Sequence, residues 1–171
     1  PGKAGFLVGS LFNTLLYFLP PLAGTIVDRY GFKKSLLACF SIFSVGYFLI
    51  GLGGLPQGKP LVEALGGATY MIVALVITAI GGSLIKPSIV GTVARTTTKE
   101  TSALGYSIYY TLVNIGGALG PFIALAVRES LGISYVLVVS SLTSLALFGA
   151  TTAFYREPPR AADAPPARSM A

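Results

Sequence analysis

The 171-residue chain is 53% apolar and only 11% charged, with a formal net charge of +6. Soluble domains carry about 25% charged residues, so this composition excludes a water-soluble fold. The sequence contains no histidine and one cysteine, which excludes a His/Cys metal cluster, a histidine-activated nucleophile and an internal disulfide. Its basic residues are scattered between apolar runs and form no stripe, so nucleic acid is not an expected partner. We expect neither an enzyme nor a cofactor-binding protein.

Five apolar stretches follow one another along the chain, each long enough to cross a bilayer, which takes roughly 20 residues. They lack the alternation of barrel strands, and a membrane offers no partner for open backbone groups. We therefore predict an all-α, polytopic transmembrane bundle whose spans cover residues 4–27, 35–52, 68–94, 103–127 and 133–155. A loop is expected from the second span to about Gly67. Residues 156–171, rich in Pro and Ala, are expected to form a disordered tail.

The basic residues outside the spans are divided unequally between the two sides of the predicted bundle. One side has Arg29, Lys33, Lys34, Arg95, Lys99, Arg156, Arg160 and Arg168, whereas the other has Lys3, Lys59 and Arg128. Because an excess of Lys and Arg marks the cytoplasmic face, the first group and the tail are predicted to be cytoplasmic. The chain would then be an integral protein of the inner or plasma membrane. Its first residues would lie outside the cell, which predicts a further helix upstream.

Lys86 is a charged residue inside the third span, nine residues before Arg95 and so about 13 Å deep. An ammonium group at that depth costs about 2.5–3.5 kcal/mol, and it is retained mainly where it faces protein, water or a substrate. The alternative is a lysine that only reaches an interface. Pro87 is expected to disturb the helix at this point and to free carbonyl groups.

Asn114 on the fourth span and Tyr17 on the first lie about 16–18 Å from the same boundary, close to the depth of Lys86. An amide, a phenol and an ammonium group at one depth are typical of the wall of a polar substrate site. The alternatives are an interhelical hydrogen bond for Asn114 and ordinary aromatic packing for Tyr17.

Gly116 and Gly120 lie four residues apart on one face of the fourth span. This spacing lets two membrane helices approach closely, so both are predicted to be helix-packing residues.

The segment GTIVDRYGFKK, residues 24–34, resembles the signature between the second and third helices of the major facilitator superfamily. Phe32 departs from that signature, which usually has a basic residue there. Residues 82–87 (GSLIKP) and 110–116 (YTLVNIG), together with Tyr17, resemble the proton-dependent oligopeptide transporters of that superfamily. Ser88 departs from their pattern, which usually has Asn. The resemblance covers residues 12–155.

This resemblance implies a twelve-helix carrier of which the chain supplies helices two to six of the amino-terminal half. Lys86 would bind the carboxylate of a peptide and take part in proton coupling, Asn114 would hydrogen-bond the peptide, and Tyr17 would line the site. The cytoplasmic gate would comprise Gly24, Asp28, Arg29, Gly31, Lys33 and Lys34. The implied partners are a small solute, protons, the lipid bilayer, the first helix and the six-helix carboxy-terminal half.

We therefore expect a secondary active transporter, a proton-coupled symporter of peptides or similar small anionic or zwitterionic solutes that works by alternating access. Two alternatives stay open. One is a major facilitator efflux carrier for drugs or sugars, in which Lys86 would be a structural partner. The other is a non-transporting helical membrane scaffold.

Overall fold

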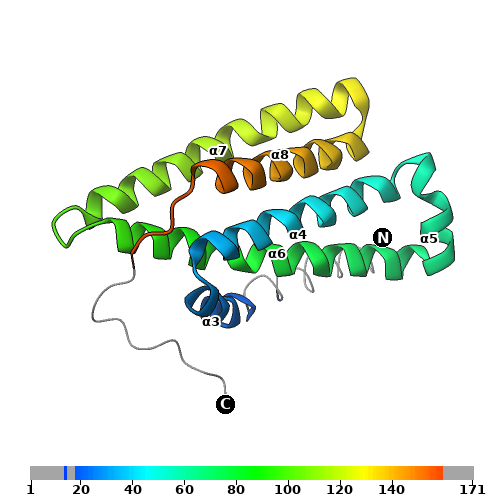
Figure 1. Cartoon of the computed structure of the whole chain (residues 1–171). Coiled ribbons are helices and arrows are strands. Elements are labelled where there is room, and N and C mark those ends of the chain that lie inside the picture. The colour runs from blue at the N-terminus through cyan, green and yellow to red at the C-terminus, as the bar shows by residue number, and fades with distance from the viewer. Residues whose placement is uncertain (1–13, 15–17, 160–171) are drawn as a thin grey trace, which may run out of the picture.

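The computed structural model describes residue 14 and residues 18–159, and every regular element within them is helical (Figure 1). The elements are α3 (Pro20–Tyr30), α4 (Phe32–Gly53), the 3-10 turn η2 (Pro56–Gly58), α5 (Lys59–Leu65), α6 (Gly67–Thr96), α7 (Ser102–Leu131) and α8 (Ile133–Phe154). The prediction of an all-α bundle is confirmed for this part of the chain. Most of the first predicted span lies outside the described residues.

Four of the helices, α4, α6, α7 and α8, are long and apolar enough to cross a membrane. They contain 22 to 30 residues each and so measure about 33–45 Å, more than the roughly 30 Å of a hydrocarbon core. Helix α4 packs along both α6 and α8 and forms the centre of the described bundle, while the short α5 crosses one end of it (Figure 1).

The interface between α4 and α6 brings two backbones close together through small residues. A Cβ atom added at Gly46 would lie 3.1 Å from the backbone N and Cα of Thr78, and one added at Gly81 would lie 3.0 Å from Ile42. Small residues allow this approach between membrane helices, which associate by van der Waals packing and polar contacts. The buried residues of α6 therefore lie on the side that faces α4.

The interface between α4 and α8 contains a pair of polar residues. Ser141 Oγ donates a hydrogen bond to the backbone oxygen of Ser44 at 2.7 Å, and the two hydroxyl oxygens are 3.2 Å apart. Hydroxyl groups that bond between helices add to packing in a membrane, by about 0.6 kcal/mol on average. At the far end of this interface, a Cβ atom at Gly51 would lie 2.9 Å from the carbonyl oxygen of Ser134.

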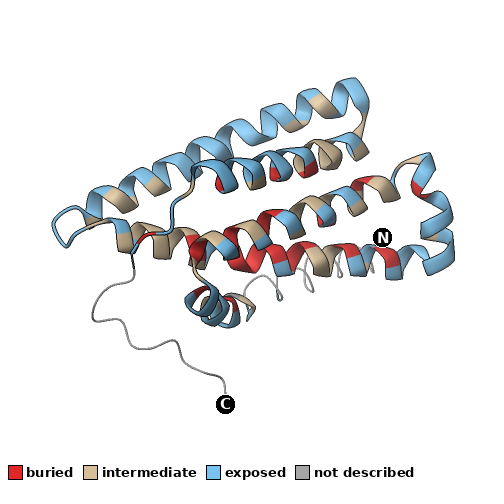
Figure 2. Cartoon of the chain, in the orientation of Figure 1, coloured by how far each residue is buried: buried red, intermediate tan, exposed pale blue. Residues whose placement is uncertain are grey.

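Helix α7 differs from the other long helices because none of its residues is buried by the part of the chain that the structure describes. It lies along the outside of the bundle and is almost entirely pale in Figure 2. Large apolar side chains such as Leu112 and Phe122 are 63% and 71% exposed. In a membrane, such a face is covered by lipid or by further helices.

Helix α6 continues without interruption from Gly67 to Thr96, so the expected disturbance at Pro87 does not break the helix. Pro87 has no amide hydrogen, so the carbonyl of Ser83, four residues earlier, loses its usual helical partner. Ser83 Oγ donates to the carbonyl of Ile80 and Ser88 Oγ to that of Leu84, both at 2.7 Å. Neighbouring helices help a membrane helix to tolerate a proline, and α6 packs along α4 here.

Two further boundaries differ from the sequence-based prediction. The expected loop before Gly67 contains η2 and α5, with Pro56 and Pro60 in their first turns, where a fixed φ favours the start of a helix. Helix α4 begins at Phe32, three residues before the predicted start of the second span.

The segments that were assigned to the cytoplasmic side meet at one end of the bundle. The guanidinium carbon of Arg95, at the end of α6, is 4.4 Å from the ring centroid of Phe32, at the start of α4. The residues that follow α8 contact the same point, through Glu157. The side of the membrane on which this end lies stays a prediction.

Candidate functional site

Lys86 lies on α6 with its side chain exposed, on the side of the helix away from α4. Leu84 and Ser88, two residues before and after it, are buried. A step of two residues turns an α-helix by about 200°, which places Lys86 opposite the packed stripe. It lies ten residues from the end of α6 at Thr96, a depth of about 15 Å. Within the part of the chain that the structure describes, its side chain therefore faces away from the packed helices.

Asn114 lies on α7, also exposed. Helices α6 and α7 are joined by residues 97–101, so the depths of Lys86 and Asn114 are counted from the same end of the bundle. Asn114 lies twelve residues after Ser102, which corresponds to about 18 Å. The structure thus leaves both residues uncovered at similar depth, while Tyr17, the third predicted member of the site, lies outside the described residues.

Gly116 and Gly120 lie on α7, and a Cβ atom added at either would meet no described atom within 4 Å. The described residues therefore show no close helix contact at either glycine, and their packing role stays a prediction.

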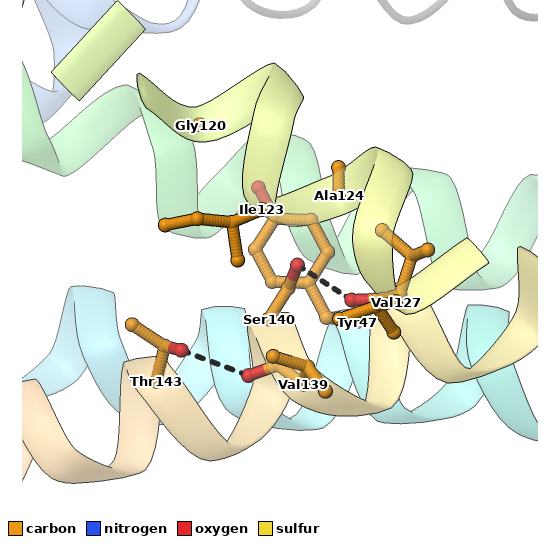
Figure 3. A pocket seen from close by; sticks show the side chains of 9 residues that line it. Tyr47, Gly120, Ile123, Ala124, Val127, Val139, Ser140 and Thr143 are labelled. Atoms are coloured by element: carbon orange, nitrogen blue, oxygen red, sulfur yellow. Dashed lines mark hydrogen bonds between the residues drawn. The ribbon is translucent and has the colours of Figure 1, made fainter. Parts of the chain in front are cut away.

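An apolar cavity of about 340 Å³ lies between α7 and α8 and is closed on one side by Tyr47 of α4 (Figure 3). Among its lining residues are Gly120, Ile123, Val127 and Val139. The nearby hydroxyls are already engaged: Ser140 bonds to the carbonyl of Val136 and Thr143 to that of Val139, both at 2.9 Å. Neither Lys86 nor Asn114 lines this cavity, so it is a gap in helix packing and not the predicted polar site.

The predicted gate residues form the end of α3, the turn at Gly31 and the start of α4. Asp28 and Arg29 are exposed on the last turn of α3, and Gly24 is partly buried one turn earlier. Gly31 has φ +88°, a left-handed value that glycine adopts without strain. Lys33 and Lys34 follow on the first turn of α4.

Phe32, which departs from the signature, is buried and packs against α6. Its ring lies against the Cα of Gly91 and beneath the guanidinium group of Arg95. A cation over an aromatic face contributes about 0.5–1 kcal/mol or more. The substitution therefore replaces a charge in this turn by an apolar anchor to α6.

Glu157 is a residue of this site that the sequence analysis did not identify. Its carboxylate oxygens accept hydrogen bonds from the backbone amides of Phe32 and Lys33, at 2.7 and 2.6 Å. Pro158 beside it is buried. The segment predicted as a disordered tail is thus held against the turn at its first residues, while residues 160–171 lie outside the described part of the chain. Only the position of Glu157 two residues after an apolar span could have drawn attention to it.

Comparison of the chain with known protein families identifies the family to which it belongs. The family description of the Major Facilitator Superfamily matches residues 1–170. The chain belongs to the major facilitator superfamily. This membership makes it an integral membrane protein of a transporter family, and it confirms the resemblance drawn from the α3–α4 turn.

Individual members of the superfamily are similar to the chain at low identity. A di-/tripeptide transporter of Lactococcus lactis subsp. lactis (strain IL1403) is 26% identical over 157 residues, which cover 91% of this chain and 29% of that protein. An uncharacterized transporter of the superfamily from Mycobacterium tuberculosis is 25% identical over 127 residues, 74% of this chain and 20% of that protein. An uncharacterized transporter of Bacillus subtilis is 27% identical over 117 residues, covering 67% and 21% respectively.

The chain therefore spans less than a third of the length of these relatives. No solved structure matches it.

Proposed function

We propose that this chain is part of a secondary active transporter, a proton-coupled symporter that moves peptides or similar small anionic or zwitterionic solutes by alternating access. Lys86 is the observation that carries the proposal. It is a cation about 15 Å inside a membrane-length helix, on the face that the described residues leave open. A charge in that position costs free energy of insertion, so it is retained mainly where it has a function. The proposed function of this charge is to bind an anionic group.

The proposed chemistry assigns a separate task to each predicted residue. The Lys86 ammonium group attracts the carboxylate of the solute, and the Asn114 amide, exposed at similar depth, hydrogen-bonds its peptide group. Tyr17 lines the same site. A proton on Lys86 is released or retained according to the charge of a carboxylate on a neighbouring helix, which couples proton movement to solute movement as access alternates.

The proposal needs partners beyond the described helices. The open faces of α6 and α7 would be covered by the first helix and by the carboxy-terminal half of the carrier, with the cavity between the two halves. The similarity to di-/tripeptide transporters of Lactococcus lactis supports peptides as the class of solute. The cytoplasmic placement of the α3–α4 turn and of the residues after α8 is part of the same proposal.

Replacement of Lys86 in the intact protein tests this function. Lys86→Ala should abolish dipeptide accumulation driven by a proton gradient in proteoliposomes. It should change thermal stability little, because the side chain is exposed on α6 and packs against none of the described helices. Lys86→Arg should still bind dipeptide but should not concentrate it, since a guanidinium group does not release its proton.

Lys99→Ala is the matched control, because Lys99 is an exposed residue of the loop between α6 and α7. This substitution should leave uptake unchanged. Normal uphill uptake by Lys86→Ala would refute both roles of Lys86. A drug or sugar carrier would then be favoured, while the absence of any solute flux in the unmodified protein would favour the scaffold.

A further inference from the structure

Helices α4 and α8 are neighbours that run in opposite directions, so the start of α4 lies beside the end of α8. At the start of α4, Glu157 accepts hydrogen bonds from the amides of Phe32 and Lys33, at 2.7 and 2.6 Å. At the end of α8, Lys33 Nζ donates a hydrogen bond to the carbonyl oxygen of Thr152 at 3.0 Å. The start of α4 is therefore capped by a charged side chain from the segment after α8, and the end of α8 by a charged side chain from α4.

The two charges match the two helix ends. The first amides of a helix and its last carbonyls have no partner within the helix. The helix dipole favours a negative charge at the amino-terminal end and a positive charge at the carboxy-terminal end. Glu157 and Lys33 meet both requirements, and hydrogen bonds to ionised groups are the stronger class in proteins.

We propose that Glu157 and Lys33 form a reciprocal clasp between α4 and α8, in which Glu157 is the positioning residue of the α3–α4 turn. The clasp locks that turn to the segment through which the chain leaves α8. The description of the turn as a gate rests on the proposed function. The clasp itself follows from the geometry of the described residues.

The turn is shaped to admit the carboxylate of Glu157. A Cβ atom added at Gly31 would lie 2.9 Å from Glu157 Oε1, so a larger residue there would displace the carboxylate as well as strain a backbone with φ +88°. Glycine at this position therefore serves both the turn and the clasp.

The segment after α8 is also held on its other side. The hydroxyl groups of Tyr155 and Thr92 of α6 form a hydrogen bond, and Pro158 is buried. Residues 155–158 thus tie the ends of α4, α6 and α8 together. A motion that separates the α3–α4 turn from this segment breaks the two hydrogen bonds of Glu157.

Hydrogen exchange in the intact protein tests the clasp directly. In Glu157→Ala, peptides that cover residues 31–36 should contain two amides that exchange at least about tenfold faster than in the unmodified protein, because each loses a bond to an ionised acceptor. Glu157→Gln keeps the length of the side chain and one carbonyl acceptor, so amide exchange should accelerate less in this variant. It replaces the alanine variant in the test if that variant does not fold. Glu100→Ala, an exposed acidic residue at the same end of the bundle, is the control and should leave this exchange unchanged.

The second half of the clasp has its own measurement. Lys33→Met should increase the rate of trypsin cleavage after Arg156 about tenfold, because it releases the end of α8, whereas Lys34→Met at the neighbouring exposed position should not. Unchanged exchange at residues 31–36 in both Glu157 variants, or equal cleavage in the two lysine variants, would overturn the proposal. Neither readout depends on transport, so a protein that shows the clasp but no peptide uptake would refute the proposed function and leave the clasp standing.

Discussion

Gly46 of α4 lies directly against Thr78 of α6, with no space for a side chain between the two backbones. The Thr78 hydroxyl is fixed by a hydrogen bond of 2.8 Å to the carbonyl of Ala74, one turn earlier. This contact sets the distance between the two helices at the centre of the described bundle.

Gly46→Ala should destabilise the protein, because the added methyl group would lie 3.1 Å from backbone atoms of Thr78 that cannot move independently. Overpacking of this kind costs about 1–3 kcal/mol. Thermal unfolding in detergent measures the change. Gly149→Ala in α8 is the matched control, since its added Cβ would meet no described atom within 4 Å, and alanine is the better helix former by up to about 1 kcal/mol. Equal stability of Gly46→Ala and the unmodified protein would contradict the close approach of α4 and α6.

Cys39 should be almost unreactive in the folded protein because its side chain is 0% exposed. A membrane-permeant maleimide should label it slowly in detergent-solubilised protein and rapidly after denaturation in sodium dodecyl sulfate. The physical reason is burial, since the thiol lies in the core between α3, α4 and α6. Rapid labelling before denaturation would show that this core is open.

Single cysteines at the ends of the helices should report the orientation of the bundle. In a Cys39→Ala background, a cysteine at position 59 should react with an impermeant maleimide in intact cells, whereas cysteines at 99 and 168 should react only after permeabilisation. The asymmetry of Lys and Arg between the two sides is the reason. Lys59 and Lys99 are both exposed, so the difference measures sidedness and not burial. The opposite pattern would invert the topology and would place the α3–α4 turn outside the cell.

The helical character of the bundle could be predicted from the sequence because it depends on local properties. An apolar run of membrane length must satisfy its own backbone groups, and a helix does so within one segment. The third, fourth and fifth predicted spans accordingly coincide with α6, α7 and α8 to within a few residues. The distance of Lys86 from the end of its helix could be predicted in the same way, because a helix has a fixed rise per residue.

The start of α4 could not be predicted, because the group that caps it is Glu157, 125 residues away from Phe32 in the sequence. The continuity of α6 through Pro87 could not be predicted either. It depends on the packing of α6 against α4. Both features depend on contacts with parts of the chain that are distant in the sequence.

The sequence by itself determined that this protein lies in a membrane, that its spans are helices and that its basic residues lie mainly at one end, since each property follows from composition and spacing along one segment. Only the tertiary structure decided which faces of those helices meet. It placed Lys86 on the side of α6 that the described residues leave exposed, brought Gly46 against Thr78, and joined Glu157 to the first turn of α4. The physical reason is that lipid is as apolar as the side chains, so hydrophobicity alone does not select a partner, and shape and polar contacts between distant residues make the choice.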